Sequence, residues 1–169
     1  MKIFNRLTLL CVALLICVNG WAQGKLSDTK LETLSGEVVS VPEFGKKHLL
    51  IFYVDPDRHK QNEDFINELE QNHYADSPMI EAFGVINFKD CSFPNFLVRT
   101  LTRKRTEKNG ALVLADYDNV LSRDWNLGSC NNQFVIIFIT KDGELAFLGK
   151  GELSKEQQEE FLATIAKYK

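Results

Sequence analysis

One stretch decides the fold: Leu49-Leu50-Ile51-Phe52-Tyr53-Val54, followed by Asp55-Pro56-Asp57. The first six residues are all apolar and rich in β-branched and aromatic side chains. Because they do not alternate with polar residues, they predict a strand that is buried on both faces. Such a strand belongs at the centre of a sheet that helices cover on each side.

The segments around this strand alternate between strand and helix patterns. Residues 60–73 place Phe65, Ile66 and Leu69 on one face of a helix. Helices between buried strands predict parallel neighbours. The other expected elements of this half are a short strand at 38–41, a strand at 82–88, a helix lined by Phe93, Phe96, Leu97 and Leu101 that ends near Asn109-Gly110, a strand at 111–115 and a short helix within 119–127.

The C-terminal part predicts a hairpin and a last helix. Residues 134–139 form the most hydrophobic strand, and Asp142-Gly143 is typical of the tight turn that leads to an edge strand at 145–148. The last helix is expected to begin after Ser154, with Gln157 in the reciprocal position of a capping box. Its buried stripe is expected to consist of Phe161, Leu162, Ile165 and Ala166.

Residues 1–22 have the pattern of a secretory signal peptide. Lys2 and Arg6 precede an apolar run at 7–18, and small residues stand at the expected cleavage point. The run is shorter than the roughly 20 residues that cross a bilayer. We therefore expect residues 23–169 to form a single periplasmic domain with no membrane span after cleavage; the alternative is an uncleaved anchor.

Composition and charge exclude several classes of protein. Of the 169 residues, 44% are hydrophobic and 25% charged, which is too apolar for disorder and too charged for a multi-span membrane protein. Residues 23–169 carry 18 basic and 23 acidic side chains, a net charge of −5 that argues against nucleic-acid binding. They keep only Cys91 and Cys130, so the core must provide the stability.

The element order resembles the thioredoxin-like fold of the peroxiredoxin and TlpA kind. That resemblance implies an α/β three-layer sandwich whose mixed central sheet ends in a C-terminal β-hairpin and helix. Residues 34–41 and Gly45-Lys46 look like the entry to such domains. Residues 52–57, Gln61-Asn62, residues 84–90 and Pro94-Asn95-Phe96 more closely resemble motifs of the YtfJ family, which are small exported bacterial proteins of this fold with a poorly defined function.

The chain departs from the redox members of this fold at the position of their active site. Those enzymes carry Cys-x-x-Cys directly after the central strand, where a helix N-terminus lowers the pKa of the first thiol. Here the two cysteine positions correspond to Asp57 and Lys60. The cis-proline of the fold is also missing, because Asn131-Asn132-Gln133 occupies that stretch. We therefore expect no dithiol oxidoreductase activity.

The candidate site residues come from loops that follow the expected strands. The carboxyl ends of parallel strands share one edge of a sheet, and open α/β sheets place their ligand sites there. The candidate crevice residues are Asp55, Asp57, His59, Lys89, Asp90 and Asp116.

Asp55-Pro56-Asp57 has two interpretations. An Asp-x-Asp after a buried strand resembles the pattern of Mg²⁺-dependent phosphotransferases, with Lys89, Asp90 and later carboxylates as further candidates. Alternatively, Asp55 caps a helical turn, Pro56 begins it and Asp57 lies at its positive end. The histidines show no metal-ligand spacing. The expected binding module needs neither metal nor cofactor.

Cys91 and Cys130 are expected at the mouth of the same crevice. Cys91 follows a strand parallel to the central one, and Cys130 precedes a strand antiparallel to it, so both thiols belong to the same sheet edge. Flanking strands start near 10 Å apart, whereas a disulfide needs Cα atoms within about 7 Å. A disulfide and an atypical redox role both stay open.

A basic run contains Arg99, Arg103, Lys104, Arg105 and Lys108. A solvated helix face is the expected interpretation, and a site for an acidic partner or an anionic surface is the alternative. Phe93, Phe96 and Trp125 are expected in the core. The function hypothesis is a binding or assembly module for an envelope protein partner, with the oligomeric state left open. The alternatives are a metal-dependent hydrolase or transferase and an atypical redox protein.

Overall fold

The computed structural model describes residues 24–169, so the expected signal peptide at 1–22 lies outside the described residues. No helix within 24–169 is long and apolar enough to cross a membrane. The elements are β1 (Lys30–Thr33), β2 (Val38–Ser40), β3 (His48–Val54), the 3₁₀ turn η1 (Pro56–Arg58), α1 (Glu63–Gln71), β4 (Ile80–Asn87), α2 (Asn95–Asn109), β5 (Val113–Asp116), α3 (Val120–Asp124), β6 (Phe134–Ile139), β7 (Leu145–Lys150) and α4 (Lys155–Tyr168).

A single mixed sheet runs through the molecule in the order β2-β1-β5-β4-β3-β6-β7. The central strand β3 pairs in parallel with β4 and antiparallel with β6, so that Ile51 lies between Phe83 and Ile137. The pairing explains the continuous apolar run of the sequence, since Leu49, Leu50 and Ile51 are all buried. The expected central position of this strand is confirmed.

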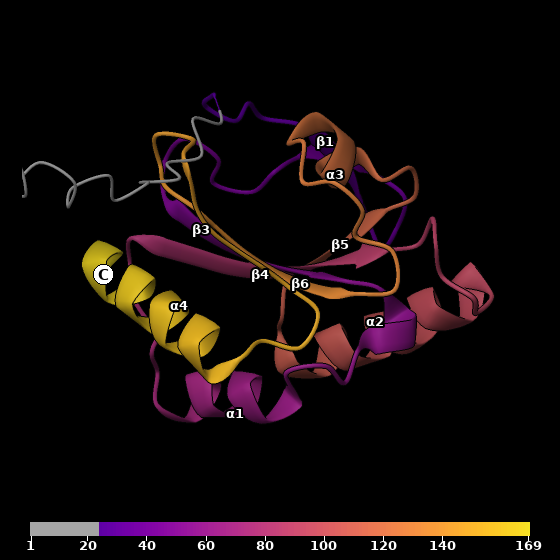
Figure 1. Cartoon of the computed structure of the whole chain (residues 1–169). Helices are drawn as coiled ribbons and strands as arrows, with labels where there is room; N and C mark the ends of the chain where they lie inside the picture. The colour runs from indigo at the N-terminus through magenta and orange to yellow at the C-terminus, as the bar shows by residue number, and fades with distance from the viewer. Residues whose placement is uncertain (1–23) are drawn as a thin grey trace, which may run out of the picture.

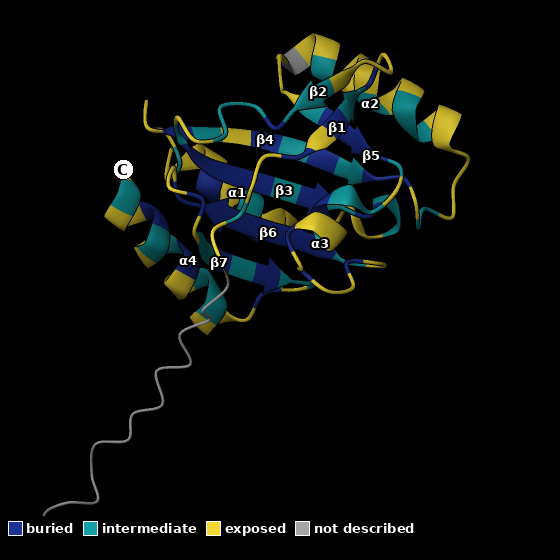
Figure 2. Cartoon of the chain, turned by 90° about the horizontal axis from the view of Figure 1, so that it is seen from above, coloured by how far each residue is buried: buried dark blue, intermediate teal, exposed yellow. Residues whose placement is uncertain are grey.

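Helices and loops cover both faces of the sheet, which gives the expected three-layer sandwich (Figures 1 and 2). On one face, α1 and α4 bury Leu50, Ile136 and Phe161 in a common cluster. On the other face, α3 and the segment before β1 cover a second cluster that includes Trp125. The thioredoxin-like frame, with its closing hairpin and helix, is therefore present.

The expected burial of four apolar residues in α2 and the loop before it is wrong. Phe93, Phe96, Leu97 and Leu101 are exposed by 57%, 67%, 47% and 61% of their surface. The helix packs instead through its opposite side, where Val98 contacts a small cluster around Phe88. Apolar spacing indicated a helix correctly but gave the wrong buried face.

Local capping follows the expected chemistry at the C-terminal end. Ser154 and Gln157 form the reciprocal capping box of α4. The turn between β6 and β7 uses a positive φ of 82° at Gly143 alone, and a bulge falls at Phe138/Ile139. A type I′ turn at Asp142-Gly143 would need positive φ at both residues, whereas here Thr140 N–H donates to Glu144 O (2.9 Å), so the hairpin loop is longer and spans residues 141–143.

Candidate functional site

The loop after β3 is held by the carboxylate of Asp55. This side chain is 1% exposed, and Oδ1 accepts a hydrogen bond from the backbone N–H of Asp57 (2.9 Å) while Oδ2 accepts one from that of Asn132 (2.7 Å). The first bond caps η1, and Pro56 begins that turn. Both oxygens thus accept hydrogen bonds from backbone N–H groups, in agreement with the interpretation of Asp55 as a capping residue.

Asp116 plays the same role at the end of β5. It is 1% exposed and accepts backbone N–H bonds from Asp118, Val120 and Leu121, at 3.1, 2.8 and 3.0 Å, which hold the start of α3. The Tyr53 hydroxyl donates to Oδ2 at 3.2 Å. Burial, together with this carboxylate, raises the pKa of Tyr53 far above its usual range, so the phenol stays a donor.

Asp90 and Lys89 interact with other polar groups at this sheet edge. Asp90 Oδ2 accepts from the amide groups of Asn87 (3.2 Å) and Asn119 (3.1 Å). The Lys89 ammonium lies 3.6 Å from Asp118, and both side chains are exposed. Asp90 and Asp116 are therefore linked through Asn119 and Tyr53, since the Tyr53 hydroxyl also lies 3.4 Å from Asn119 Oδ1.

A groove opens directly after β3, and we call it the loop groove. Its volume is about 320 Å³. Of the six expected crevice residues, only Asp57 and His59 line it, while Asp55, Lys89, Asp90 and Asp116 do not. The lining residues are Asp57, Arg58, His59, Lys60, Gln61 and Glu152.

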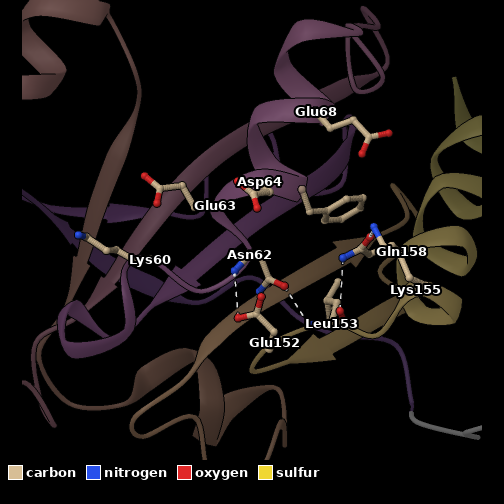
Figure 3. A pocket seen from close by; sticks show the side chains of 10 residues that line it. Lys60, Asn62, Glu63, Asp64, Glu68, Glu152, Leu153, Lys155 and Gln158 are labelled. Carbon is tan, nitrogen blue, oxygen red and sulfur yellow. Dashed lines mark hydrogen bonds between the residues drawn. The ribbon is translucent and has the colours of Figure 1, made fainter.

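A second pocket of about 410 Å³ adjoins the loop groove and shares Lys60 and Glu152 with it (Figure 3). Asn62 lies between the two walls, where its amide donates to Gly151 O (2.8 Å) and its carbonyl accepts from Leu153 N–H (2.8 Å). The start of α1 is thereby tied to the loop between β7 and α4. Both concavities consequently have a fixed wall.

Sequence reasoning missed Arg58, Lys60, Gln61 and Glu152 as groove residues. The first three stand next to Asp57 and His59, so their position after the central strand was an available signal. Glu152 follows β7, far along the chain, and no local pattern connects it to this loop. The structure shows the connection, because Asn62 N–H lies 3.4 Å from Glu152 Oε2.

Asp57 bridges the groove to the loop after β4. Its Oδ2 accepts from the backbone N–H of Ser92 at 3.1 Å. Its Oδ1 is buried and has no hydrogen-bond partner among the described residues. Within residues 24–169, no three His, Cys, Asp or Glu side chains are grouped as metal ligands would be.

Both cysteines of the described chain are free thiols, with Cys130 buried and Cys91 partly exposed. Burial raises the pKa of Cys91, and the carboxylates of Asp57 and Asp55 add to the increase. Burial also raises the pKa of Cys130; Lys150 opposes this, whereas Asp116 and Asp90 reinforce it. The two thiols share an acidic edge of the sheet that favours their protonated form, and a bridge between them stays an open alternative.

The sheet order, the covering helices and the closing hairpin define a thioredoxin-like α/β fold, and known structures agree. The exposed lipoprotein thioredoxin Etrx1 of Streptococcus pneumoniae has a TM-score of 0.58 at 14% identity, covering 83% of this chain and 99% of its own. A putative thioredoxin from Neisseria meningitidis has a TM-score of 0.58 at 18% identity, with coverage of 85% and 91%.

The peroxiredoxin branch of the fold matches as well. The mitochondrial 2-Cys peroxiredoxin of Plasmodium falciparum has a TM-score of 0.54 at 14% identity, covering 86% of this chain and 92% of its own. No family model matches the chain, and no curated protein does. The similarity to solved structures shows the fold and carries no activity with it.

Proposed function

We propose that the chain is an exported, periplasmic binding or assembly module of the YtfJ family, which uses the loop groove for an envelope protein partner and has no dithiol oxidoreductase activity. The signal-peptide pattern at 1–22 supports export, and the motifs at 52–57 and 84–90 support membership of the family. The observation that carries the proposal is the loop groove itself, which occupies the place after β3 with no cysteine in its lining.

The groove offers polar groups of both signs to a partner. Arg58 and Lys60 supply cations, while Asp57 and Glu152 supply carboxylates. The buried Asp57 Oδ1 still lacks a donor among the described residues, and an unsatisfied buried acceptor costs about 1–3 kcal/mol. Because this atom is buried, the N–H or ammonium group of a partner reaches it only if the Asp57 side chain turns outward.

The two alternatives receive less support. A hydrolase at Asp55 and Asp57 needs carboxylate oxygens that can bind Mg²⁺, but both oxygens of Asp55 already accept backbone N–H groups. A redox role for Cys91 and Cys130 needs a thiolate, and both pKa values are raised.

Photocrosslinking in the cell envelope tests the proposal. A crosslinking amino acid replaces His59, which lines the loop groove, and in a matched control it replaces Lys141, an exposed residue of the β6–β7 turn. The proposal expects one adduct of defined mass from position 59 and none of that mass from position 141. The same adducts from both positions, or none from either, would overturn it.

A further inference from the structure

Helix α2 presents its larger apolar side chains to the outside, together with most of its charged ones. Counting 3.6 residues per turn, Phe96, Leu97 and Leu101 fall on the outward side, and all three are exposed. The inward stripe consists of Val98, Thr102 and Thr106, which are only partly exposed. Figure 2 shows the helix without any of the dark blue that marks buried residues. This arrangement is the reverse of a helix that packs on its own core.

The same helix has an excess of positive charge in an acidic chain. Five basic residues and one acidic residue give α2 a net charge of +4, whereas the remainder of 23–169 carries −9. The exposed apolar side chains gather in the first half of the helix and four of the five cations in the second. The basic residues are Arg99, Arg103, Lys104, Arg105 and Lys108, and the acidic one is Glu107.

From this charge and exposure we infer that α2 docks on an anionic phospholipid surface. Phe96, Leu97 and Leu101, joined by the exposed Phe93 in the loop before the helix, would enter the boundary between headgroups and acyl chains. Lys104 and Lys108 follow on the same side at helical spacing, and their long side chains reach lipid phosphates.

Shape and charge favour a lipid surface over the other occupants. The helix is a convex ridge, and neither the loop groove nor the adjoining pocket includes any α2 residue. Neither of these two concavities therefore offers a peptide partner a groove along α2. A symmetric pair of copies would bring two helices of charge +4 together, which is repulsive. The surface is separate from the loop groove, so this inference does not rest on the function proposed above.

Vesicle flotation tests the inference with residues 23–169, which contain every described element and all three core clusters. The probes are vesicles of equal parts phosphatidylcholine and phosphatidylglycerol, compared with phosphatidylcholine alone. We expect binding to the anionic vesicles that falls with added salt, and little binding to the neutral ones.

Two double variants separate charge from apolar contact. Each basic residue near an anionic surface is worth roughly fivefold in binding, so Lys104→Gln with Lys108→Gln should weaken it about 25-fold. Phe96→Gln with Leu101→Gln keeps the charge and should weaken binding by at least about tenfold. Matched controls are Lys25→Gln with Lys141→Gln for charge and Met79→Gln for exposed apolar surface, and these should bind as the parent does. Unchanged melting temperatures show that each variant is folded.

Several results would overturn the inference. Equal binding to both kinds of vesicle, or equal losses in the α2 variants and the controls, would remove the role of α2. Capture on immobilised polyglutamate without vesicle binding would assign the surface to an acidic protein. Sedimentation that shows a dimer dependent on Phe96 would assign it to a second copy of the chain.

Discussion

Asp55 shows how one side chain can be mistaken for a catalytic group. Its place after a buried strand suits a metal site, but both oxygens hold backbone N–H groups in the structure. Asp55→Asn puts an amide group against one of those donors, and it should lower the free energy of unfolding by about 1–3 kcal/mol. Thermal melts with and without millimolar Mg²⁺ measure this. Stabilisation by Mg²⁺ that the substitution abolishes would contradict the capping role and favour the hydrolase.

His48 gives the fold a dependence on pH near neutrality. Burial, reinforced by Lys141 and opposed by Asp142, lowers its pKa below the ordinary 6.5. Its Nδ1 lies 3.2 Å from the backbone N–H of Lys141, and its ring packs on Phe138 and Tyr168. The unfolded chain therefore binds this proton first as pH falls, so the free energy of unfolding should decrease below about pH 6.5 and level off once the folded pKa is passed.

Melts at pH 7.5 and 5.5, with His48→Gln as the matched variant, measure that effect. Glutamine keeps an acceptor for Lys141 N–H but does not titrate, so its melting temperature should change less between the two pH values. Equal changes in the two proteins would show that another group causes the dependence.

At the scale of the elements, β6 and α4 differ in how they stabilise the fold. Ile137 is completely buried in the middle of β6, so Ile137→Ala should cost about 2–5 kcal/mol. Ser154→Ala removes only the side-chain cap of α4 and should cost about 1 kcal/mol. Chemical denaturation measures both. Equal small losses would mean that β6 is not a core strand.

Elements with a strong local signal could be predicted from the sequence. Strand β6 has the predicted bounds, and the capping box of α4 is present. Strand β1 was not predicted, because Lys30-Leu31-Glu32-Thr33 is short and charged. Its pairing with β2 and β5 is what makes it a strand, and local sequence does not show this pairing. The buried face of α2 was predicted wrongly, since apolar spacing cannot show which surface a helix turns toward its neighbours.

The candidate site was predictable only in part for a similar reason. Of the residues that the strand ends indicated, Asp57 and His59 line the loop groove. Whether Asp55 and Asp116 face a ligand or cap backbone depends on loop conformations that sequence spacing does not determine. The sequence could not indicate Glu152 as a groove residue, because Glu152 lies 90 residues along the chain from Asn62, whose backbone N–H it contacts.

At the scale of the whole molecule, Cys91 and Cys130 flank the central strand from β4 and β6. Both are free and protonation is favoured, so protein taken from an oxidising envelope and alkylated without reductant should carry two alkyl groups by intact mass. An unalkylated protein would instead contain the bridge. Its loop of about 40 residues would then stabilise the fold by on the order of 3–4 kcal/mol in the chain-entropy model.

The central claim is that the loop groove binds a partner without thiol chemistry. Photocrosslinking from position 59 in a chain with Cys91→Ser and Cys130→Ala tests it most directly, because that chain has no thiol left within residues 23–169. The account predicts the same adduct, in the same yield, as in the chain that keeps both cysteines. Loss of the adduct from a variant whose melting temperature is unchanged would contradict it and show that partner capture depends on a thiol.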